Sequence, residues 1–288
     1  MGNRTANLES PPCQGSHHGA DEGMRWTVVL LLLCHFAMAE DLTFPSPAAS
    51  PELMIPLGNG ALFTSIGGDP KYETFPLFTD LVKAEQPADP KKPALNFAGT
   101  SRAIVTLDWL NDDAPATNYQ HRLDLADGTS VVTFKRGGAG FTWTTFISKP
   151  DDLLVLHLRT DKPGALNFRM ELAAKTQNDN GQDAKVEDRR ILAVHYKDFA
   201  ARMWVYPMES EVTPGENEIT VKGEGEALVL LAVTTDKDHI PHLPDRIKTL
   251  AGEDHPDTFA LWTGLLDRHR KTAQASGLED YLKNIRSK

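Results

Sequence analysis

The stretch from Tyr119 to Ala174 constrains the fold most, because short apolar segments follow one another along it with turn residues between them. Phe141, Trp143 and Thr145 alternate with polar neighbours, so they share one side of an extended chain. Turn pairs close the segments at regular intervals: Asp127-Gly128, Gly137-Gly138 and Pro163-Gly164. Regular short strands without intervening helices predict a mainly β protein, a large two-sheet antiparallel β-sandwich.

Further strands are predicted on both sides of this stretch, at 102–110, 191–196, 201–208, 218–222 and 227–235, and we expect the last two to form a hairpin. In the segment 153–158, Leu154, Leu156 and Leu158 share one face and Leu153, Val155 and His157 share the other. Alternation of this kind predicts one buried face and one face in water.

The pattern becomes helical after Thr235. Residues 243–251 have helical spacing, and beyond Thr258 the apolar face is predicted to consist of Phe259, Trp262, Leu265, Leu266 and His269. Asp254 or Asp257 can cap this helix, with Pro256 in its first turn. In a chain by itself we expect the face of Phe259, Trp262 and Leu266 to stay partly exposed.

The N-terminal region has the features of a secretory signal. Residues 24–39 begin with a basic residue, continue with a short apolar run and end in small residues, which predicts cleavage after Ala39 and a secreted or periplasmic chain. The apolar run from Trp26 to Leu33 is too short to span a bilayer. Met24 is a second candidate start, and a lipoprotein signal ending at Cys34 is an alternative. The predicted organisation is 1–39 extension and signal peptide, 40–55 linker, 56–237 sandwich and 238–288 helical linker.

Charge and cysteine content exclude several classes of function. The formal net charge is −10 and no basic stripe is present, which argues against nucleic-acid binding. The two cysteines, Cys13 and Cys34, both precede the predicted cleavage point. A disulfide framework and a cysteine nucleophile are therefore not expected, and no cofactor or metal is predicted.

Five segments, taken in order, resemble the N-terminal domain of glycoside hydrolase family 95, the inverting α-L-fucosidases and their relatives. They are PLGNGA at 56–61, YQHRLDL at 119–125, SKPDDLLVL at 148–156, DKPGAL at 161–166 and ALVLLAVTTDKD at 227–238. The resemblance implies a sandwich that packs on an (α/α)6 catalytic barrel and a fucose-containing polysaccharide as substrate. Residues 69–99 depart from the family, because the Trp-containing segment that follows the glycine loop in relatives is missing. The chain ends at Lys288 without positions that match the barrel, so no catalytic residue is assigned.

Three residues are candidates for contact with a sugar. The resemblance places Asn59 in a loop that faces the barrel, so Asn59 could touch substrate, whereas the alternative is a tight strand entry between Gly58 and Gly60. Trp143 and Trp204 could stack on sugar rings, but a tryptophan in a strand more often packs in the core.

The other polar clusters are interpreted as structural. Asp236, Asp238, His239 and His242 form the densest set of potential metal ligands, but the prolines beside them favour a solvated loop. Solvation is also favoured over a paired-carboxylate site for Asp108, Asp112 and Asp113. Three serines lack a nucleophile-elbow context and two histidines alternate within strands: Ser130, Ser148, Ser210, His157 and His195.

These observations predict a secreted accessory or truncated relative of the family 95 enzymes, not catalytic alone, with a barrel supplied by another chain or by an unread continuation of the same gene. The alternatives are a free-standing carbohydrate-binding module and a structural cell-envelope sandwich with no sugar ligand.

Overall fold

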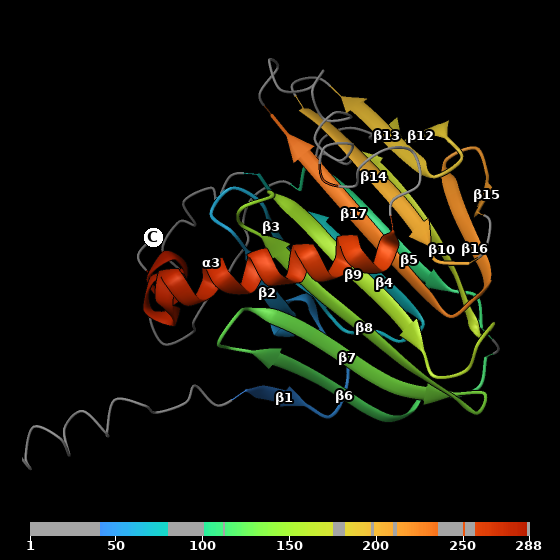
Figure 1. The fold of residues 1–288 in the computed structure, drawn as a ribbon, viewed down its shortest axis with the longest axis horizontal. Coiled ribbons are helices and arrows are strands. Elements are labelled where there is room, and N and C mark those ends of the chain that lie inside the picture. The colour runs from blue at the N-terminus through green and yellow to red at the C-terminus, as the bar shows by residue number, and fades with distance from the viewer. Residues whose placement is uncertain are drawn as a thin grey trace, which may run out of the picture. The chain divides into compact units, whose positions relative to one another are not determined.

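The computed structural model describes residues 41–79, 101–111, 113–174, 182–196, 199–209, 212–235, 250 and 257–286. They belong to one unit, Glu40–Lys288, and form two large antiparallel sheets, a hairpin and a C-terminal helix (Figure 1). The predicted signal peptide, the Asp236–His242 cluster and, apart from Leu250, the helical segment 243–251 lie outside the described residues. The predicted sandwich with a C-terminal helix is confirmed.

The larger sheet has nine strands, all antiparallel to their neighbours. In spatial order they are β1 (Leu42–Phe44), β6 (Thr117–Asp124), β7 (Thr129–Arg136), β8 (Ala139–Ser148), β9 (Leu153–Thr160), β17 (Glu226–Thr234), β14 (Phe199–Pro207), β13 (Ile191–Tyr196) and β12 (Lys185–Asp188). The strands β6 to β9 form successive hairpins, and Asp127-Gly128 and Gly137-Gly138 lie in the first two turns, as predicted. Pro163-Gly164 lies after β9, where the chain crosses to the other sheet instead of forming a hairpin. Between β7 and β8, Gly137 and Gly138 both have positive φ, which a two-residue hairpin turn of this hand requires.

The second sheet has six strands. Its main path is β15 (Val212–Pro214), β16 (Glu218–Glu224), β10 (Leu166–Ala174), β5 (Ala103–Trp109) and β4 (Tyr72–Leu77), and β11 (Gln182–Asp183) pairs with β10. A short 3₁₀ turn, η1 (Pro51–Leu53), leads into a separate hairpin of β2 (Ile55–Gly58) and β3 (Phe63–Ile66).

The predicted hairpin of 218–222 with 227–235 is wrong. β16 pairs with β10 and β15 in the smaller sheet, whereas β17 lies between β9 and β14 in the larger one. The chain therefore changes sheet at Gly225 instead of turning back on itself. The burial of the two strands agrees with this separation, because every residue from Ala227 to Ala232 is buried, whereas β16 alternates buried and accessible residues over its first five positions.

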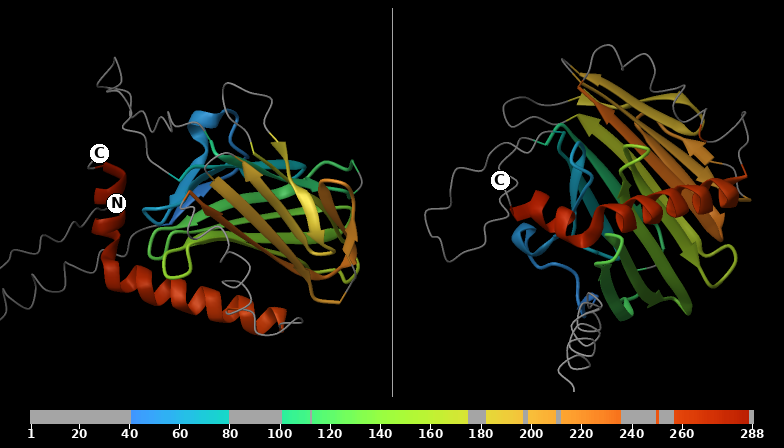
Figure 2. Two further views of the ribbon diagram at one scale, coloured as in Figure 1. Left: turned by 90° about the horizontal axis from the view of Figure 1, so that it is seen from above. Right: turned by 60° about the vertical axis from the view of Figure 1, so that its left-hand side comes forward.

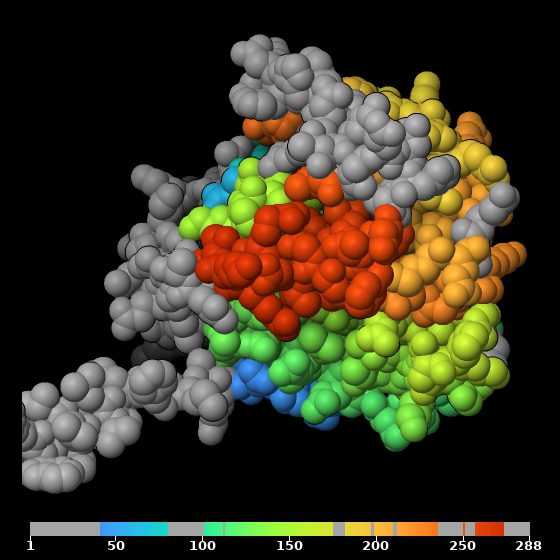
Figure 3. Space-filling model, in the orientation of Figure 1, coloured from blue at the N-terminus to red at the C-terminus, as the bar shows by residue number. Residues whose placement is uncertain are grey.

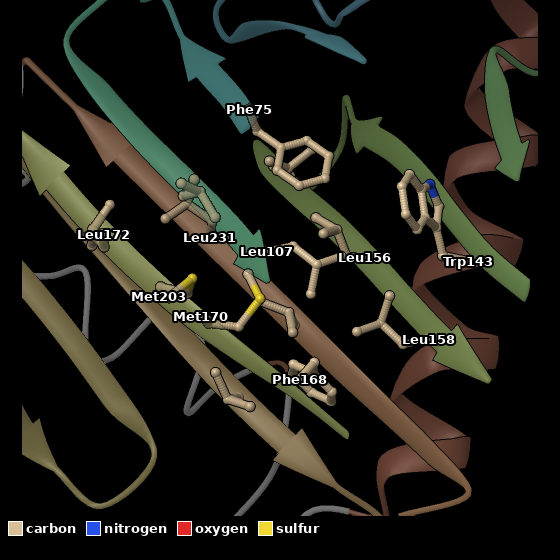
Figure 4. Close-up of a cluster of buried hydrophobic side chains, with 14 of the residues drawn as sticks. Phe75, Leu107, Trp143, Leu156, Leu158, Phe168, Met170, Leu172, Met203 and Leu231 are labelled. Atoms are coloured by element: carbon tan, nitrogen blue, oxygen red, sulfur yellow. The ribbon is translucent and has the colours of Figure 1, made fainter. Parts of the chain in front are cut away.

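The main core lies between the two sheets. It contains the inward side chains of β9, with Leu107, Phe168 and Met170 of the smaller sheet opposite them (Figure 4). Trp109 of β5 stacks on Trp143 of β8 with ring centroids 5.9 Å apart and planes 8° from parallel. Burial of each large apolar side chain contributes roughly 1.5–3 kcal/mol, so this layer holds the two sheets together.

A second apolar layer covers the outer face of the larger sheet, which corrects the expectation of a wet face. Leu153 and Val155 of β9 are fully buried together with Leu228 and Leu230 of β17. The helix α3 (Thr258–Arg286) covers this face, and Figures 1 and 2 show it running across the strands of the larger sheet. In the space-filling view the helix forms a continuous surface over them (Figure 3). Strands that are apolar on both faces need a cover on both faces.

The helix begins where its sequence predicts. Asp257 is the N-cap, because its Oδ1 accepts hydrogen bonds from the backbone N–H groups of Phe259 and Ala260 at 3.1 Å. Leu261, Trp262 and Leu265 face the sheet, and Trp262 is only 8% exposed. Phe259 is 57% exposed and Leu266 is only partly buried, which agrees with the expected partial exposure of this face, whereas the burial of Trp262 was not expected. Among the described residues, no helix is both long and apolar enough to cross a membrane.

We expect Leu265→Ala to lower the free energy of unfolding by about 2–5 kcal/mol, because it leaves a cavity under a helix face that is fully buried. Phe259→Ala on the same helix is the matched control and should change the free energy by no more than about 0.5 kcal/mol. Urea unfolding followed by circular dichroism measures both. Equal effects of the two substitutions would show that α3 is not docked.

Candidate functional site

Asn59 lies in the turn between β2 and β3 and uses its whole side chain within the protein. Its Oδ1 accepts hydrogen bonds from the N–H groups of Ala61 at 2.9 Å and Leu62 at 2.8 Å. Its Nδ2 donates to the carbonyl of Ser148 at 3.1 Å and to Asp152 Oδ1 at 3.0 Å. Two donors and two acceptor positions are all that an amide offers, so Asn59 joins the hairpin to the β8–β9 turn. Its predicted contact with substrate stays a prediction.

Trp143 and Trp204 both lie in hydrophobic clusters. Trp143 is fully buried between the sheets, and Trp204 is 3% exposed beneath α3. These positions agree with the alternative given for each tryptophan, which was packing in the core. Sugar stacking by either ring stays a prediction to which this burial gives no support, and the structure does not bring the two rings together with Asn59.

Both described carboxylates of the predicted acidic edge are in ion pairs. Asp113 binds Lys71 at 2.6 Å, and Asp108 binds Arg169 at 2.6 Å on the outer face of the smaller sheet. Arg169 also lies 3.3 Å from Glu171 and 3.5 Å from Glu218, so three carboxylates share one guanidinium. Asp112 lies outside the described residues. Within the described ranges, no group of three or more His, Cys, Asp or Glu residues could hold a metal ion.

The least expected polar residue is Glu73, which sequence reasoning did not select. It lies on β4 and is 1% exposed. Its carboxylate accepts backbone hydrogen bonds from Gly67 at 2.8 Å and Asp69 at 2.7 Å. Burial raises the pKa of the Glu73 carboxyl to about 7, although the backbone N–H groups of Gly67 to Asp69 act in the opposite direction.

Tyr119 and His121 of β6 face the turn that Glu73 holds. A side chain on Gly68, where φ is +80°, would lie 2.3 Å from the Tyr119 hydroxyl and 2.8 Å from His121 Nδ1, so only glycine fits. Burial raises the pKa of Tyr119, and its hydroxyl makes no hydrogen bond with the described residues. His121 Nε2 bonds to Ser130 Oγ at 2.7 Å, and burial lowers the pKa of His121 to about 4.

This interior cluster is the candidate site on electrostatic grounds, since strongly shifted pKa values gather at functional sites. Its geometry limits what it can do. Inverting glycoside hydrolysis needs an acid and a base about 6.5–9.5 Å apart with a sugar between them. Glu73 is sealed from solvent, and the clustered surface carboxylates are bound to Arg169. The cluster can hold a proton and join two sheets, but it does not offer a sugar a pair of carboxyls.

One signal in the sequence could have identified Glu73. In the strand 72–77, Glu73 shares its face with Phe75 and Leu77, both of which are fully buried. A carboxyl on the apolar side of an alternating strand must be buried and bonded. The alternation in 72–77 carries this signal, whereas the family resemblance, from which 69–99 depart, does not.

A second polar cluster fixes α3 to the sheet. Arg268 Nε donates to Asp151 Oδ1 at 3.1 Å, and Arg270 Nε donates to Asp127 Oδ2 at 2.8 Å. His269 Nε2 bonds to the carbonyl of Asp127 at 2.7 Å. Ser148 Oγ donates a hydrogen bond to Asp151 Oδ2 at 2.6 Å. Ser148, which was not expected to be a nucleophile, therefore orients the carboxylate that binds Arg268 of the helix. Three consecutive helix residues thus anchor to two different hairpin turns.

Glu73 and His121 should contribute to stability with opposite dependence on pH. The pKa of Glu73 is raised, so its contribution is complete below pH 4.5 and is lost as the pH rises through 7. The pKa of His121 is lowered, so its contribution is complete above pH 6.5 and is lost as the pH falls through 4. Relative to the unsubstituted chain, Glu73→Gln should gain stability as the pH rises from 4.5 to 7, and His121→Gln should lose it, each by up to about 3 kcal/mol. Urea unfolding at several pH values measures both, and slopes of the same sign would contradict the assignment.

Comparison with known proteins agrees with this architecture. The family model described as glycosyl hydrolase family 65, N-terminal domain, matches residues 79–239, more than half of the 288 residues. A curated relative, alpha-L-fucosidase 2 of Arabidopsis thaliana, is 23% identical over 176 residues, which cover 50% of this chain and 21% of that protein. The chain thus spans about a fifth of the length of this relative.

Two solved structures are similar at low identity. A putative kojibiose phosphorylase from the human microbiome has a TM-score of 0.37 and 13% identity, with 76% of this chain and 35% of that chain covered. A bacterial glucoamylase complexed with acarbose has a TM-score of 0.42 and 9% identity, with 82% and 40% covered. Both scores are below 0.5, so neither similarity assigns a function. The family 95 resemblance expected from the sequence is supported only as far as a glycoside hydrolase N-terminal domain.

The match over residues 79–239 and the two-sheet sandwich of the described residues lead to one conclusion: the chain belongs to the family of glycosyl hydrolase family 65 N-terminal domains.

Proposed function

We propose that this chain serves as the non-catalytic β-sandwich of a carbohydrate-active enzyme system. The family match carries the proposal. The catalytic acid and base would come from an (α/α)6 barrel on another chain or on another part of the same protein. Two features of the described residues support a non-catalytic role: Glu73 is inaccessible, and the carboxylates of Asp108, Glu171 and Glu218 are ion-paired with Arg169.

The substrate class we propose is a polysaccharide with terminal fucose or a similar sugar. The similarity to alpha-L-fucosidase 2 and the five matching segments support this choice. We also propose that the chain is exported, with cleavage near Ala39, because residues 24–39 have the pattern of a signal peptide.

We expect the purified exported chain to release no product from aryl α-L-fucosides or from plant and algal polysaccharides. The mass of the same purified chain will show whether it begins at Glu40. The physical reason for the expected inactivity is that the proposed catalytic acid and base lie outside this sandwich, whereas the one described carboxyl with a strongly raised pKa, Glu73, is buried. Product release measured by absorbance and by reducing-end assay tests this expectation. Turnover by the chain alone would overturn the non-catalytic assignment.

Glycan binding is the second candidate function, and the outer face of the smaller sheet favours it. Tyr72 of β4 is 53% exposed and pairs in register with Asp108, which pairs in turn with Arg169. Cross-strand partners share a face, so an aromatic ring, a carboxylate and a guanidinium lie in one row. A glycan-binding surface needs an aromatic ring that packs on the apolar face of a sugar. It also needs polar groups beside the ring that form hydrogen bonds with the sugar hydroxyls.

If this face binds glycan, retention of the chain on insoluble polysaccharide should fall at least about tenfold for Tyr72→Ala, corresponding to about 1.4 kcal/mol. Phe259→Ala is the matched control, because Phe259 is equally exposed but lies on α3. Depletion from the supernatant measures retention. No retention of the unsubstituted chain on any glycan would favour a structural role instead.

A further inference from the structure

Two buried histidines lie in the interface between α3 and the larger sheet, and they are arranged reciprocally. His157 belongs to the sheet and stacks on Trp262 of the helix, with ring centroids 4.0 Å apart and planes at 21°. His269 belongs to the helix and stacks on Phe146 of the sheet, with centroids 4.3 Å apart and planes at 21°. The two residues are 4% and 7% exposed, respectively. Each imidazole therefore packs as a flat, neutral ring against an aromatic partner across the interface.

The hydrogen bonds fix the proton on the same nitrogen of both rings. His157 Nε2 lies 2.5 Å from Glu226 Oε1, and His269 Nε2 lies 2.7 Å from the carbonyl oxygen of Asp127. Both partners accept hydrogen bonds, so Nε2 carries the hydrogen in the neutral ring. A second proton would have to go to Nδ1 of an imidazole that is buried in the interface. Charging a buried group without solvent is costly.

Charged neighbours act on both histidines from several elements. His157 faces Glu226 of β17, which favours its charged form, and Arg159 of β9, which opposes it. His269 faces Asp127 in the β6–β7 turn and Asp151 in the β8–β9 turn, which favour charge, and Arg270 on its own helix, which opposes it. Burial is the largest influence on both, and it lowers the pKa of each imidazole below 6.5.

We propose that α3 is an acid-releasable cover of the larger sheet, which leaves its docked position when His157 and His269 take up protons. The docked state holds both rings neutral, whereas an undocked helix exposes them to water, where they charge readily. Protons therefore bind more strongly to the undocked state, and the helix is released as the pH falls below 6.5. Release uncovers the apolar outer face, including Leu153, Val155 and Leu230.

The direct measurement is hydrogen–deuterium exchange of the full chain at pH 7.5 and pH 5, with each rate corrected for the intrinsic effect of pH on exchange. We expect exchange of the amides in 258–273 to be at least about tenfold faster at pH 5, while strands β7 and β8 stay protected. Binding of a hydrophobic dye should increase over the same pH range, because an apolar sheet face is uncovered. Unchanged exchange in 258–273, or equal loss of protection in the strands, would overturn a local release.

The double variant His157→Gln and His269→Gln tests the histidines themselves, since glutamine keeps a donor but takes up no proton in this range. We expect its change in helix exchange between the two pH values to be about threefold or less. His195→Gln is the matched control, because His195 is 56% exposed on β13, and it should respond like the unsubstituted chain. An undiminished response of the double variant would attribute release to Asp127 and Asp151 and overturn the proposal. If the double variant does not fold, the single variant His269→Gln, expected to lose part of the response, decides the same question.

Discussion

The structure depends on strands at the centre of the larger sheet that are apolar on both faces. In β9 and β17 the inward side chains pack on the smaller sheet and the outward side chains pack under α3. A strand of this kind cannot lie at a wet surface. Leu153 and Leu154 are both fully buried, and exposing either side chain to water would lose roughly 1.5–3 kcal/mol of stabilisation from burial. The central position of the two strands, the opposing sheet and the covering helix all follow from this requirement.

Several of the polar groups that the packing buries are bonded at defined points. Glu73 closes the turn at Gly67 to Asp69, and the polar residues 268–270 fix α3 to the turns at Asp127 and Asp151. Buried polar contacts contribute directional specificity that apolar contact lacks. The polar contacts of residues 268–270 set the position of α3 over the sheet. Leu261 and Leu265 stabilise the docked helix by burial, but apolar contact does not fix one position of the helix along the sheet.

The family match and the geometry together describe a β-sandwich domain with a well-packed interior. The interior cluster around Glu73 has the electrostatics of a functional site, but it lies where no substrate can reach. Burial is the largest cause of the shifted pKa values there, and it acts without any substrate. Under the proposed function, the catalytic groups would lie outside this sandwich, whose own contribution would be support, glycan contact or both.

Much of the fold was predictable because period-two alternation and glycine turns are local properties. The strands from Tyr119 to Ala174, the turn at Gly137-Gly138 and the cap at Asp257 all form where the sequence indicates. The candidate site was less predictable, since Trp143 and Trp204 are core residues and Glu73 was visible only through the face that it shares with Phe75. Tertiary structure alone decided that β16 and β17 separate into different sheets and that α3 covers β9. Alternation specifies the two faces of a strand but not what lies against each face, because that depends on long-range packing between elements far apart in the chain.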